Sequence, residues 1–205
     1  MWRIFPVYRH VNTDIVNENS TGADLRSRRP LIVLDRDGVI NRDSDSFIKS
    51  PDEWIALPGS PEAIGRLNEA GYTVIVATNQ SGIGRGLLSV ETLDQIHDKM
   101  SKTITDAGGH LEAIYFCPHE PDADCDCRKP KPGLLQQIIK DYGRSAAELI
   151  IIGDSMRDLE AAWAICAQSI LVRTGNGPLT EKNLPKDRRV DIFDDLSAVA
   201  DHLTT

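Results

Sequence analysis

The sequence has no apolar run long enough to span a membrane, and it has fewer basic residues than acidic residues. No uninterrupted apolar stretch approaches the ~18 residues of a spanning helix, and residues 1–16 lack the core of about 7–15 apolar residues of a secretory signal. The chain carries 23 Lys and Arg against 31 Asp and Glu, a formal net charge of −8. That sign disfavours a surface for polyanions such as nucleic acids. We therefore expect a cytoplasmic protein with no membrane partner and no nucleic-acid partner.

Cysteine is also scarce, and its distribution excludes a disulfide framework. Three of the four cysteines fall between residues 117 and 127, in the pattern C-x-H-x5-C-x-C. Three thiolates and one imidazole at this spacing are typical of a closed, tetrahedral site for structural Zn²⁺. Its ligands would be Cys117, His119, Cys125 and Cys127. We expect the remaining Cys166 in the core and His97 in solvent.

Internal repeats and low-complexity tracts are absent as well. The length of 205 residues fits one domain of the usual ~150 residues with an appendage. Residues 1–30 show no sustained hydrophobic period, so we expect a poorly ordered N-terminal extension. We expect residues 31–205 to form a single domain.

From residue 31 onward, short apolar runs alternate with helical periods. The runs are nearly continuous in apolar, often β-branched residues, which is typical of strands buried on both faces of a parallel sheet. They cover residues 31–34, 73–77, 113–116, 149–152 and 169–172. Helical periods begin at Ser60, Ser89, Leu134 and Asp158. The alternation predicts an α/β fold with a doubly wound, mainly parallel sheet, whose ligands bind beyond the carboxyl ends of the strands.

Polar side chains follow three of these runs. Asp35 and Asp37 come directly after the first run, two residues apart and therefore on the same side of an extended segment. Thr78, Asn79, Gln80 and Ser81 follow the second run, and Asp154 follows the fourth. Each motif alone is a common surface loop or turn. Together they supply oxygen ligands for a hard cation such as Mg²⁺, beside a phosphate site.

Four motifs resemble those of the haloacid-dehalogenase-like (HAD-like) phosphatases, in the same order. They are Asp35-Arg-Asp37-Gly-Val, Thr78, the lysine of Arg128-Lys129-Pro130, and Gly153-Asp154. The resemblance implies a HAD-like Rossmannoid fold in which Asp35 is a nucleophile that forms an aspartyl-phosphate and Asp37 is the general acid and base. It also implies that Thr78 and Lys129 hold the phosphoryl group. The implied Mg²⁺ ligands are Asp35, the main-chain carbonyl of Asp37, and Asp154.

Asp158 lies one helical turn beyond Asp154 and has two interpretations. It is either a supporting acid of the same site or an ordinary acid in the first turn of a helix, where the helix dipole favours negative charge. The sequence alone does not decide between them.

The intervals between the motifs leave no room for a separate cap domain. One loop, one helix and one strand fill residues 38–77, and one helix, one strand and the zinc-binding loop fill residues 79–128. We therefore expect an open site whose specificity comes from residues 43–48 and from the zinc loop. The candidate substrate-binding residues are Asp43, Ser44, Asp45, Ser46, Asn79, Gln80, Ser81 and Arg128. Because Arg128 directly follows a zinc ligand, the metal loop would orient it toward the substrate.

Within the HAD-like family, residues 49–54, 81–86 and 127–132 resemble the phosphatases that remove one phosphate from a heptose bisphosphate, on the route to lipopolysaccharide. That resemblance implies a small phosphorylated sugar as substrate, and we expect a monomer. The five-residue gap between His119 and Cys125 is equally typical of the related histidinol-phosphate phosphatases, which remain the alternative. Arg85 and its neighbouring glycines favour the sugar phosphatases.

Two other classes are disfavoured by the same residues. A receiver domain keeps phosphate on an aspartate as a signal, but Asp37 beside the nucleophile would speed hydrolysis. An inactive zinc-stabilised binding module would not need the complete set of acids at the strand ends.

Overall fold

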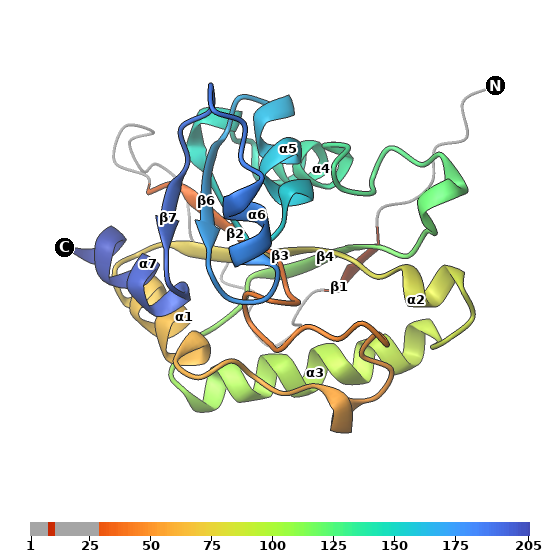
Figure 1. The fold of residues 1–205 in the computed structure, drawn as a ribbon. Helices are drawn as coiled ribbons and strands as arrows, with labels where there is room; N and C mark the ends of the chain where they lie inside the picture. Colours follow the sequence, from red (N-terminus) through yellow and green to blue (C-terminus); the bar gives the residue numbers. More distant parts are fainter. Residues whose placement is uncertain (1–7, 11–28) are drawn as a thin grey trace.

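The computed structural model describes residues 8–10 and 29–205 and contains one seven-stranded sheet (Figure 1). In spatial order the strands are β1 (Tyr8–His10), β4 (Ala113–Cys117), β3 (Thr73–Asn79), β2 (Leu31–Leu34), β5 (Leu149–Gly153), β6 (Gln168–Val172) and β7 (Asp191–Phe193). β1 pairs antiparallel with β4, and the other neighbouring strands are parallel. The predicted doubly wound, mainly parallel α/β fold is confirmed.

The central strand β2 shows why the apolar runs become strands of this sheet. All four of its residues are buried, because both of its faces are covered. Its register places Leu34 opposite Val76 of β3 and Ile152 of β5. These parallel strands therefore end at the same edge, where the residues that follow them come together.

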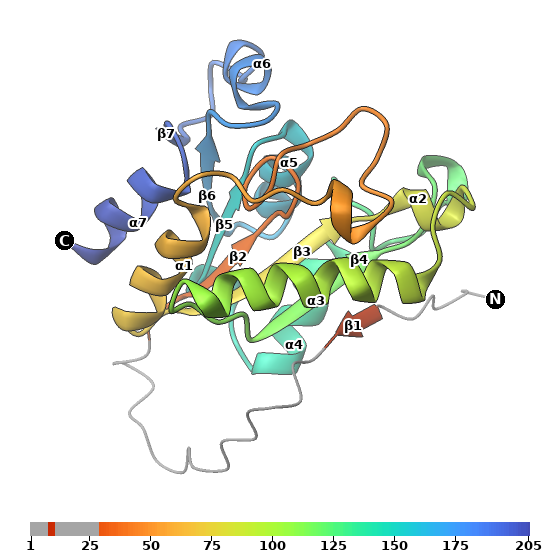
Figure 2. The same ribbon diagram turned by 90° about the horizontal axis from the view of Figure 1, so that it is seen from below.

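Helices cover both faces of the sheet. One layer contains α1 (Ser60–Glu69), α3 (Val90–Asp106) and α7 (Leu196–Thr204), and the other contains α4 (Gly133–Tyr142) and α5 (Met156–Ala164) (Figures 1 and 2). Ile32 and Leu34 pack with the first layer, whereas the alternate residues of β2 pack with the second. The connections hold α2 (Ser81–Gly84), α6 (Gly177–Lys182) and single 3₁₀ turns at 51–53, 121–123 and 146–148.

The predicted helix starts agree with the structure to within two residues, and the largest difference is at α5, which begins at Met156 rather than Asp158. The Ser89 side chain accepts a hydrogen bond from the main-chain N–H of Thr92 and caps α3. Helix α1 begins at Ser60 as predicted, and the residue at its cap position is Gly59. The Ser60 hydroxyl donates to the main-chain oxygen of Val39 at 2.8 Å. It therefore ties α1 to the segment that follows β2.

Two short strands and two side chains differ from expectation. Neither β1 nor β7 is predicted, because each is three residues long and lies at an edge of the sheet. His97 is buried rather than solvated, because it lies on the face of α3 that packs toward Phe116. Cys166 is exposed rather than buried, since it follows the end of α5 in a turn with a φ of 59°.

The described residues contain no separate cap domain. The connection from β2 to α1 and the connection from β4 to α4 hold only single 3₁₀ turns, so the carboxyl edge of the sheet stays open. The predicted extension, residues 1–30, includes β1, while residues 1–7 and 11–28 lie outside the described part of the chain. In the described ranges, no helix combines the length and apolarity needed to cross a bilayer.

Candidate active site and zinc-binding cluster

The carboxyl ends of β2, β3 and β5 meet at a cavity of about 190 Å³. Of the residues predicted for catalysis, substrate and Mg²⁺, the cavity brings together Asp35, Asp37, Asp43, Ser44, Thr78, Asn79, Gln80, Ser81, Arg128, Lys129 and Asp154. Asp45 and Ser46 do not line this cavity. Asp45 lines a neighbouring cavity of about 320 Å³, which shares Asp43 and Ser44 with the first. The cavity wall also contains Arg157 and Asn176, which no sequence motif had indicated, and Arg36, to which its motif gave no role.

Lys129 is the buried cation at the centre of this site. Its ammonium group lies 3.0 Å from Asp35 Oδ1 and 2.5 Å from Asp158 Oδ1, and it donates to the main-chain oxygen of Ala77 at 2.7 Å. Burial by itself lowers the pKa of Lys129, but the carboxylates of Asp158 and Asp35 outweigh burial and raise it. The lysine therefore stays charged, and its three acceptors hold it at the end of β2.

Asp158 fits both of the interpretations that its sequence position allows. Its Oδ2 accepts hydrogen bonds from the Ser155 main-chain N–H and hydroxyl, which caps the start of α5. Its other oxygen pairs with Lys129. The same carboxylate thus begins the helix and orients the lysine.

Asp35, Asp154 and Asp158 each offer an oxygen within 4.8 Å of the others, a spacing that suits a shared cation. Burial is the largest cause that raises the pKa of Asp35 to about 6, and Lys129 opposes it. Burial likewise raises the pKa of Asp154 to about 8, and the neighbouring acids add to the shift. Lys129 pairs with both Asp35 and Asp158, so Asp154, which has no cationic partner among the described residues, carries the charge that lacks compensation. This donor set fits Mg²⁺.

Two glycines allow Asp154 to reach the loop after β2. A Cβ at Gly38 or at Gly175 would lie 2.1 Å from Asp154 Oδ2, and both glycines have positive φ. The same oxygen accepts hydrogen bonds from the main-chain N–H and side-chain amide of Asn176, at 2.7 and 3.2 Å. The loop between β6 and α6 therefore fixes this carboxylate, a contact that only the tertiary fold creates.

Asp37 is held by three side chains. Arg36, which is 1% exposed, donates to both carboxylate oxygens of Asp37 at 2.9 Å. Asn41 Nδ2 donates to Oδ1 at 2.8 Å, and Gln80 Nε2 donates to Oδ2 at 3.0 Å. Gln80 Nε2 also lies 3.0 Å from the Thr78 hydroxyl, to which it donates. The amide therefore joins Asp37 to Thr78, and this contact differs from the substrate contact that the sequence predicts for Gln80.

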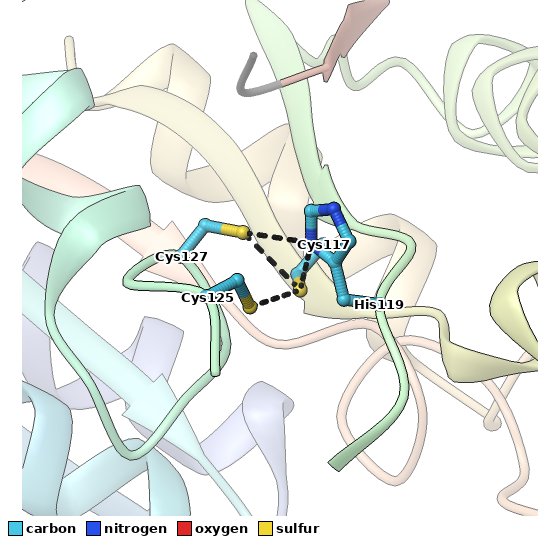
Figure 3. Close-up of side chains that lie close together, drawn as sticks. All are labelled: Cys117, His119, Cys125 and Cys127. Atoms are coloured by element: carbon cyan, nitrogen blue, oxygen red, sulfur yellow. Dashed lines mark hydrogen bonds between the residues drawn. The ribbon is translucent and has the colours of Figure 1, made fainter. Parts of the chain in front are cut away.

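The four predicted zinc ligands lie side by side at the end of β4 (Figure 3). Cys117 Sγ lies 3.7 Å from Cys125 Sγ, 3.3 Å from Cys127 Sγ and 3.5 Å from His119 Nδ1. Ligands 2.0–2.3 Å from a tetrahedral zinc ion are separated by roughly 3.5–3.8 Å. Two of the observed separations lie in this range, and the third, 3.3 Å between Cys117 and Cys127, is shorter by a few tenths of an ångström.

The thiols of the cluster are electrostatically coupled. A hydrogen bond from the Cys127 thiol lowers the pKa of Cys117 to about 5, while the same contact raises the pKa of Cys127. A buried group of three thiols and an imidazole is the donor set of a closed, structural Zn²⁺ site.

The zinc loop is joined to the phosphate side of the cavity through Asn79. Its side-chain amide donates to the main-chain oxygen of Lys129 at 3.0 Å and accepts from the Lys129 N–H at 3.1 Å. The Arg128 guanidinium donates to the main-chain oxygen of His119 at 3.3 Å. The end of β3 therefore fixes the main chain of Lys129, the second residue after Cys127.

An aspartate paired with a buried lysine, a second aspartate two residues later and an acid after β5, on a capless parallel sheet, define a HAD-like phosphatase. A family model described as "HAD-hyrolase-like" matches residues 126–199. A D-glycero-beta-D-manno-heptose-1,7-bisphosphate 7-phosphatase of Bordetella bronchiseptica is 53% identical over 175 residues, which cover 84% of this chain and 97% of the relative. The protein of the same name from Pseudomonas aeruginosa is 52% identical over 176 residues, covering 85% and 98%.

Two solved structures agree with these relatives. The D,D-heptose 1,7-bisphosphate phosphatase of B. bronchiseptica, crystallised with magnesium and phosphate, superposes with a TM-score of 0.81 at 51% identity, covering 85% of this chain and 97% of that one. The corresponding enzyme of Burkholderia thailandensis gives a TM-score of 0.68 at 42% identity, covering 86% and 100%. The chain belongs to the D-glycero-β-D-manno-heptose-1,7-bisphosphate 7-phosphatase family. The histidinol-phosphate alternative is not favoured.

Proposed function

We propose that this chain hydrolyses the 7-phosphate of D-glycero-β-D-manno-heptose 1,7-bisphosphate and leaves the 1-phosphate in place. The observation that carries the proposal is the contact of Asp35 with Lys129, beside Asp154, in a chain that is 53% identical to a phosphatase of that name. The reaction would supply a heptose 1-phosphate for nucleotide-heptose synthesis on the route to lipopolysaccharide.

Asp35 is the proposed nucleophile. Its free oxygen attacks phosphorus, and the new O–P bond forms as the bond to the sugar oxygen at C7 breaks. Asp37 gives its proton to the leaving oxygen, and the ionised Asp37 then takes a proton from the water that attacks the aspartyl-phosphate. As the water oxygen bonds to phosphorus, the bond from phosphorus to the Asp35 oxygen breaks, which restores the Asp35 carboxylate. Thr78 and Lys129 donate to the phosphoryl oxygens. The products are heptose 1-phosphate and inorganic phosphate.

The carboxylates of Asp35 and Asp154 and the main-chain carbonyl of Asp37 are the proposed Mg²⁺ ligands. When bound, Mg²⁺ supplies positive charge against these acids and the phosphate oxygens. Asp43, Ser44, Asn79, Ser81 and Arg128 are proposed to contact the sugar bisphosphate, since each lines the cavity. Asp45 and Ser46 belong to the same loop as Asp43 and Ser44 but lie outside the cavity.

Substitution of Asp35 tests the proposed chemistry. We expect Asp35→Asn to lower kcat for heptose 1,7-bisphosphate by about 10⁴-fold or more, because the nucleophile is lost. The matched control is Asp106→Asn, which removes an exposed carboxylate that pairs with Lys102 on α3 and should leave kcat unchanged. Phosphate release is measured on the zinc-loaded protein with added Mg²⁺. Full activity of Asp35→Asn would contradict the mechanism, whereas higher kcat/KM for histidinol phosphate would contradict the substrate alone.

The wider setting is proposed in the same way. We infer a cytoplasmic monomer with no nucleic-acid or membrane partner, in which residues 1–30 are an extension of the phosphatase domain, residues 31–205. Size-exclusion chromatography with light scattering tests the monomer, and limited proteolysis at the amino end tests the extension. A dimer mass, or protection of residues 1–30, would contradict these points.

A further inference from the structure

Asn176 lies at the start of α6 and lines the catalytic cavity. It occupies the cap position of this helix, where an asparagine side chain usually accepts a hydrogen bond from a main-chain N–H of the first turn. In the described first turn of α6, no N–H donates to this side chain. Capping of the helix therefore does not explain the side chain of Asn176.

The side-chain amide of Asn176 instead joins two carboxylates from separate segments. Its Nδ2 donates to Asp43 Oδ2 at 2.9 Å and to Asp154 Oδ2 at 3.2 Å. Asp43 is the first residue of the substrate loop, residues 43–48, and it is 133 positions from Asn176 in the chain. Asp154 follows β5 and is a proposed Mg²⁺ ligand. One amide thus links the substrate loop to the acid cluster.

The substrate loop is shaped by short-range hydrogen bonds. The Ser44 N–H donates to Asp43 Oδ1 at 2.8 Å, and the Phe47 N–H donates to the main-chain oxygen of Ser44 at 3.1 Å. Phe47 has a φ of 63°, a conformation that is unfavourable for a bulky side chain and persists where the surroundings hold it. Bonds between near neighbours do not place the loop relative to the sheet, whereas the bond from Asn176 does.

The segment that carries Asn176 is itself fixed to the sheet. The Thr174 hydroxyl donates to the main-chain oxygen of Gly38 at 2.6 Å. Arg173, directly after β6, pairs with Glu181 of α6 at 2.8 Å. Both contacts restrict the loop between β6 and α6, so Asn176 is a fixed point to which the substrate loop is attached.

We propose that Asn176 is a positioning residue that holds the substrate loop against Asp154 and thereby strengthens substrate binding. This inference rests on the proposed function, which assigns substrate contacts to the loop. The main-chain N–H of Asn176 also donates to Asp154 Oδ2, at 2.7 Å, and replacement by alanine keeps this bond. Loss of the side chain should therefore release the loop while Asp154 stays in place.

The kinetic test uses Asn176→Ala in the zinc-loaded protein with added Mg²⁺. We expect KM for heptose 1,7-bisphosphate to rise about fivefold, as the loss of one hydrogen bond predicts, and kcat to change by less than about twofold. In an Asp43→Ala background, Asn176→Ala should have little further effect on KM, because the acceptor on the loop is already absent.

Asn183→Ala is the matched control. Asn183 is an exposed asparagine at the other end of α6, and its amide donates to the main-chain oxygen of Leu179 at 2.8 Å. Its substitution removes one hydrogen bond from the same helix, at a separate cavity that Leu179 also lines. We expect it to leave KM and kcat unchanged.

Hydrogen exchange measured by mass spectrometry supplies a readout that needs no substrate. In the zinc-loaded protein, main-chain amides of residues 43–48 should exchange faster in Asn176→Ala than in wild type. The amides of α3 should exchange at the same rate in both proteins, because the proposed effect is local.

Three outcomes would overturn the inference about Asn176. They are an unchanged KM in Asn176→Ala, an equal rise in KM with and without Asp43, and exchange at residues 43–48 that is either unchanged or accelerated equally in α3. If the wild-type protein does not hydrolyse the bisphosphate, the proposed function fails instead, while the exchange measurement still tests the link between Asn176 and the loop.

Discussion

Asp154 is a buried acid whose charge should destabilise the protein whenever Mg²⁺ is absent. Its side chain is 2% exposed, and burial raises its pKa from 3.8 to about 8. Asp35 and Asp158 add repulsion, which the hydrogen bonds from Asn176 only partly offset. Asp154→Asn keeps the shape of the side chain and an oxygen that can accept from Asn176, but it removes the ionisation.

The sign of the pH dependence follows from proton binding. Between pH 4 and pH 8 the folded wild-type protein holds a proton on Asp154 that the unfolded chain has released, so the free energy of unfolding falls as pH rises. One group contributes about 1.4 kcal/mol per pH unit. The raised pKa of Asp35, about 6, acts in the same direction at lower pH, but it is common to both proteins.

We expect the free energy of unfolding of Asp154→Asn minus that of wild type to increase by about 4 kcal/mol from pH 5 to pH 8, three pH units at about 1.4 kcal/mol each. The assay is urea unfolding followed by tryptophan fluorescence, with zinc retained and Mg²⁺ omitted. Protonation of the zinc ligands affects both proteins equally and cancels in the difference.

Addition of Mg²⁺ at pH 8 supplies the second half of the test. The wild-type protein should gain stability, by about 2.7 kcal/mol at a Mg²⁺ concentration 100 times the dissociation constant, while Asp154→Asn should gain little. A pH-independent difference between the two proteins, or an equal Mg²⁺ response, would refute the assignment of buried, uncompensated charge to Asp154.

The remaining predictions concern Gln80 and the zinc cluster. Gln80→Leu removes the amide that joins Asp37 to Thr78. We expect kcat to fall about tenfold with little change in KM, as measured by steady-state kinetics. A rise in KM of the same size would instead indicate that Gln80 contacts the substrate. Cys125→Ser removes one of the four predicted zinc ligands. We expect metal analysis to find less zinc per chain, and the free energy of unfolding to fall by at least about 2 kcal/mol. Full zinc occupancy in this variant would contradict a four-ligand site.

The parts of the fold that were predictable are those with a strong hydrophobic pattern. The run at residues 149–152 becomes β5, which extends one residue further to Gly153, because every residue of a central parallel strand is buried. The edge strand β7 is only partly buried and three residues long, so it lacks such a pattern. The prediction that His97 is solvated was wrong, because His97 lies on the buried, apolar face of α3. The residue type alone does not indicate burial, since histidines occur both in cores and on surfaces.

In the candidate site, too, some features were predictable from the sequence and others depend on the tertiary fold. Asp35 and Asp154 could be located from the sequence because each directly follows a strand run. The contact of Asn176 with Asp154 spans 22 residues, and the hydrogen bond from Thr174 to the main-chain oxygen of Gly38 spans 136, so only the folded chain reveals them. Arg36 lies inside a recognised motif, but its engagement with Asp37 follows from side-chain packing that the motif does not specify.

The zinc cluster is joined to Lys129 through the main chain, whereas the acid cluster contacts its side chain. Lys129 follows the zinc ligand Cys127 by two residues, and Asn79 holds its main chain from the end of β3. Its ammonium group contacts three acceptors from separate segments, at Ala77, Asp35 and Asp158. A closed zinc site can therefore influence catalysis without touching substrate, because it limits the positions open to this lysine. Mg²⁺ would differ, since its proposed ligands Asp35 and Asp154 line the cavity where the phosphate is expected.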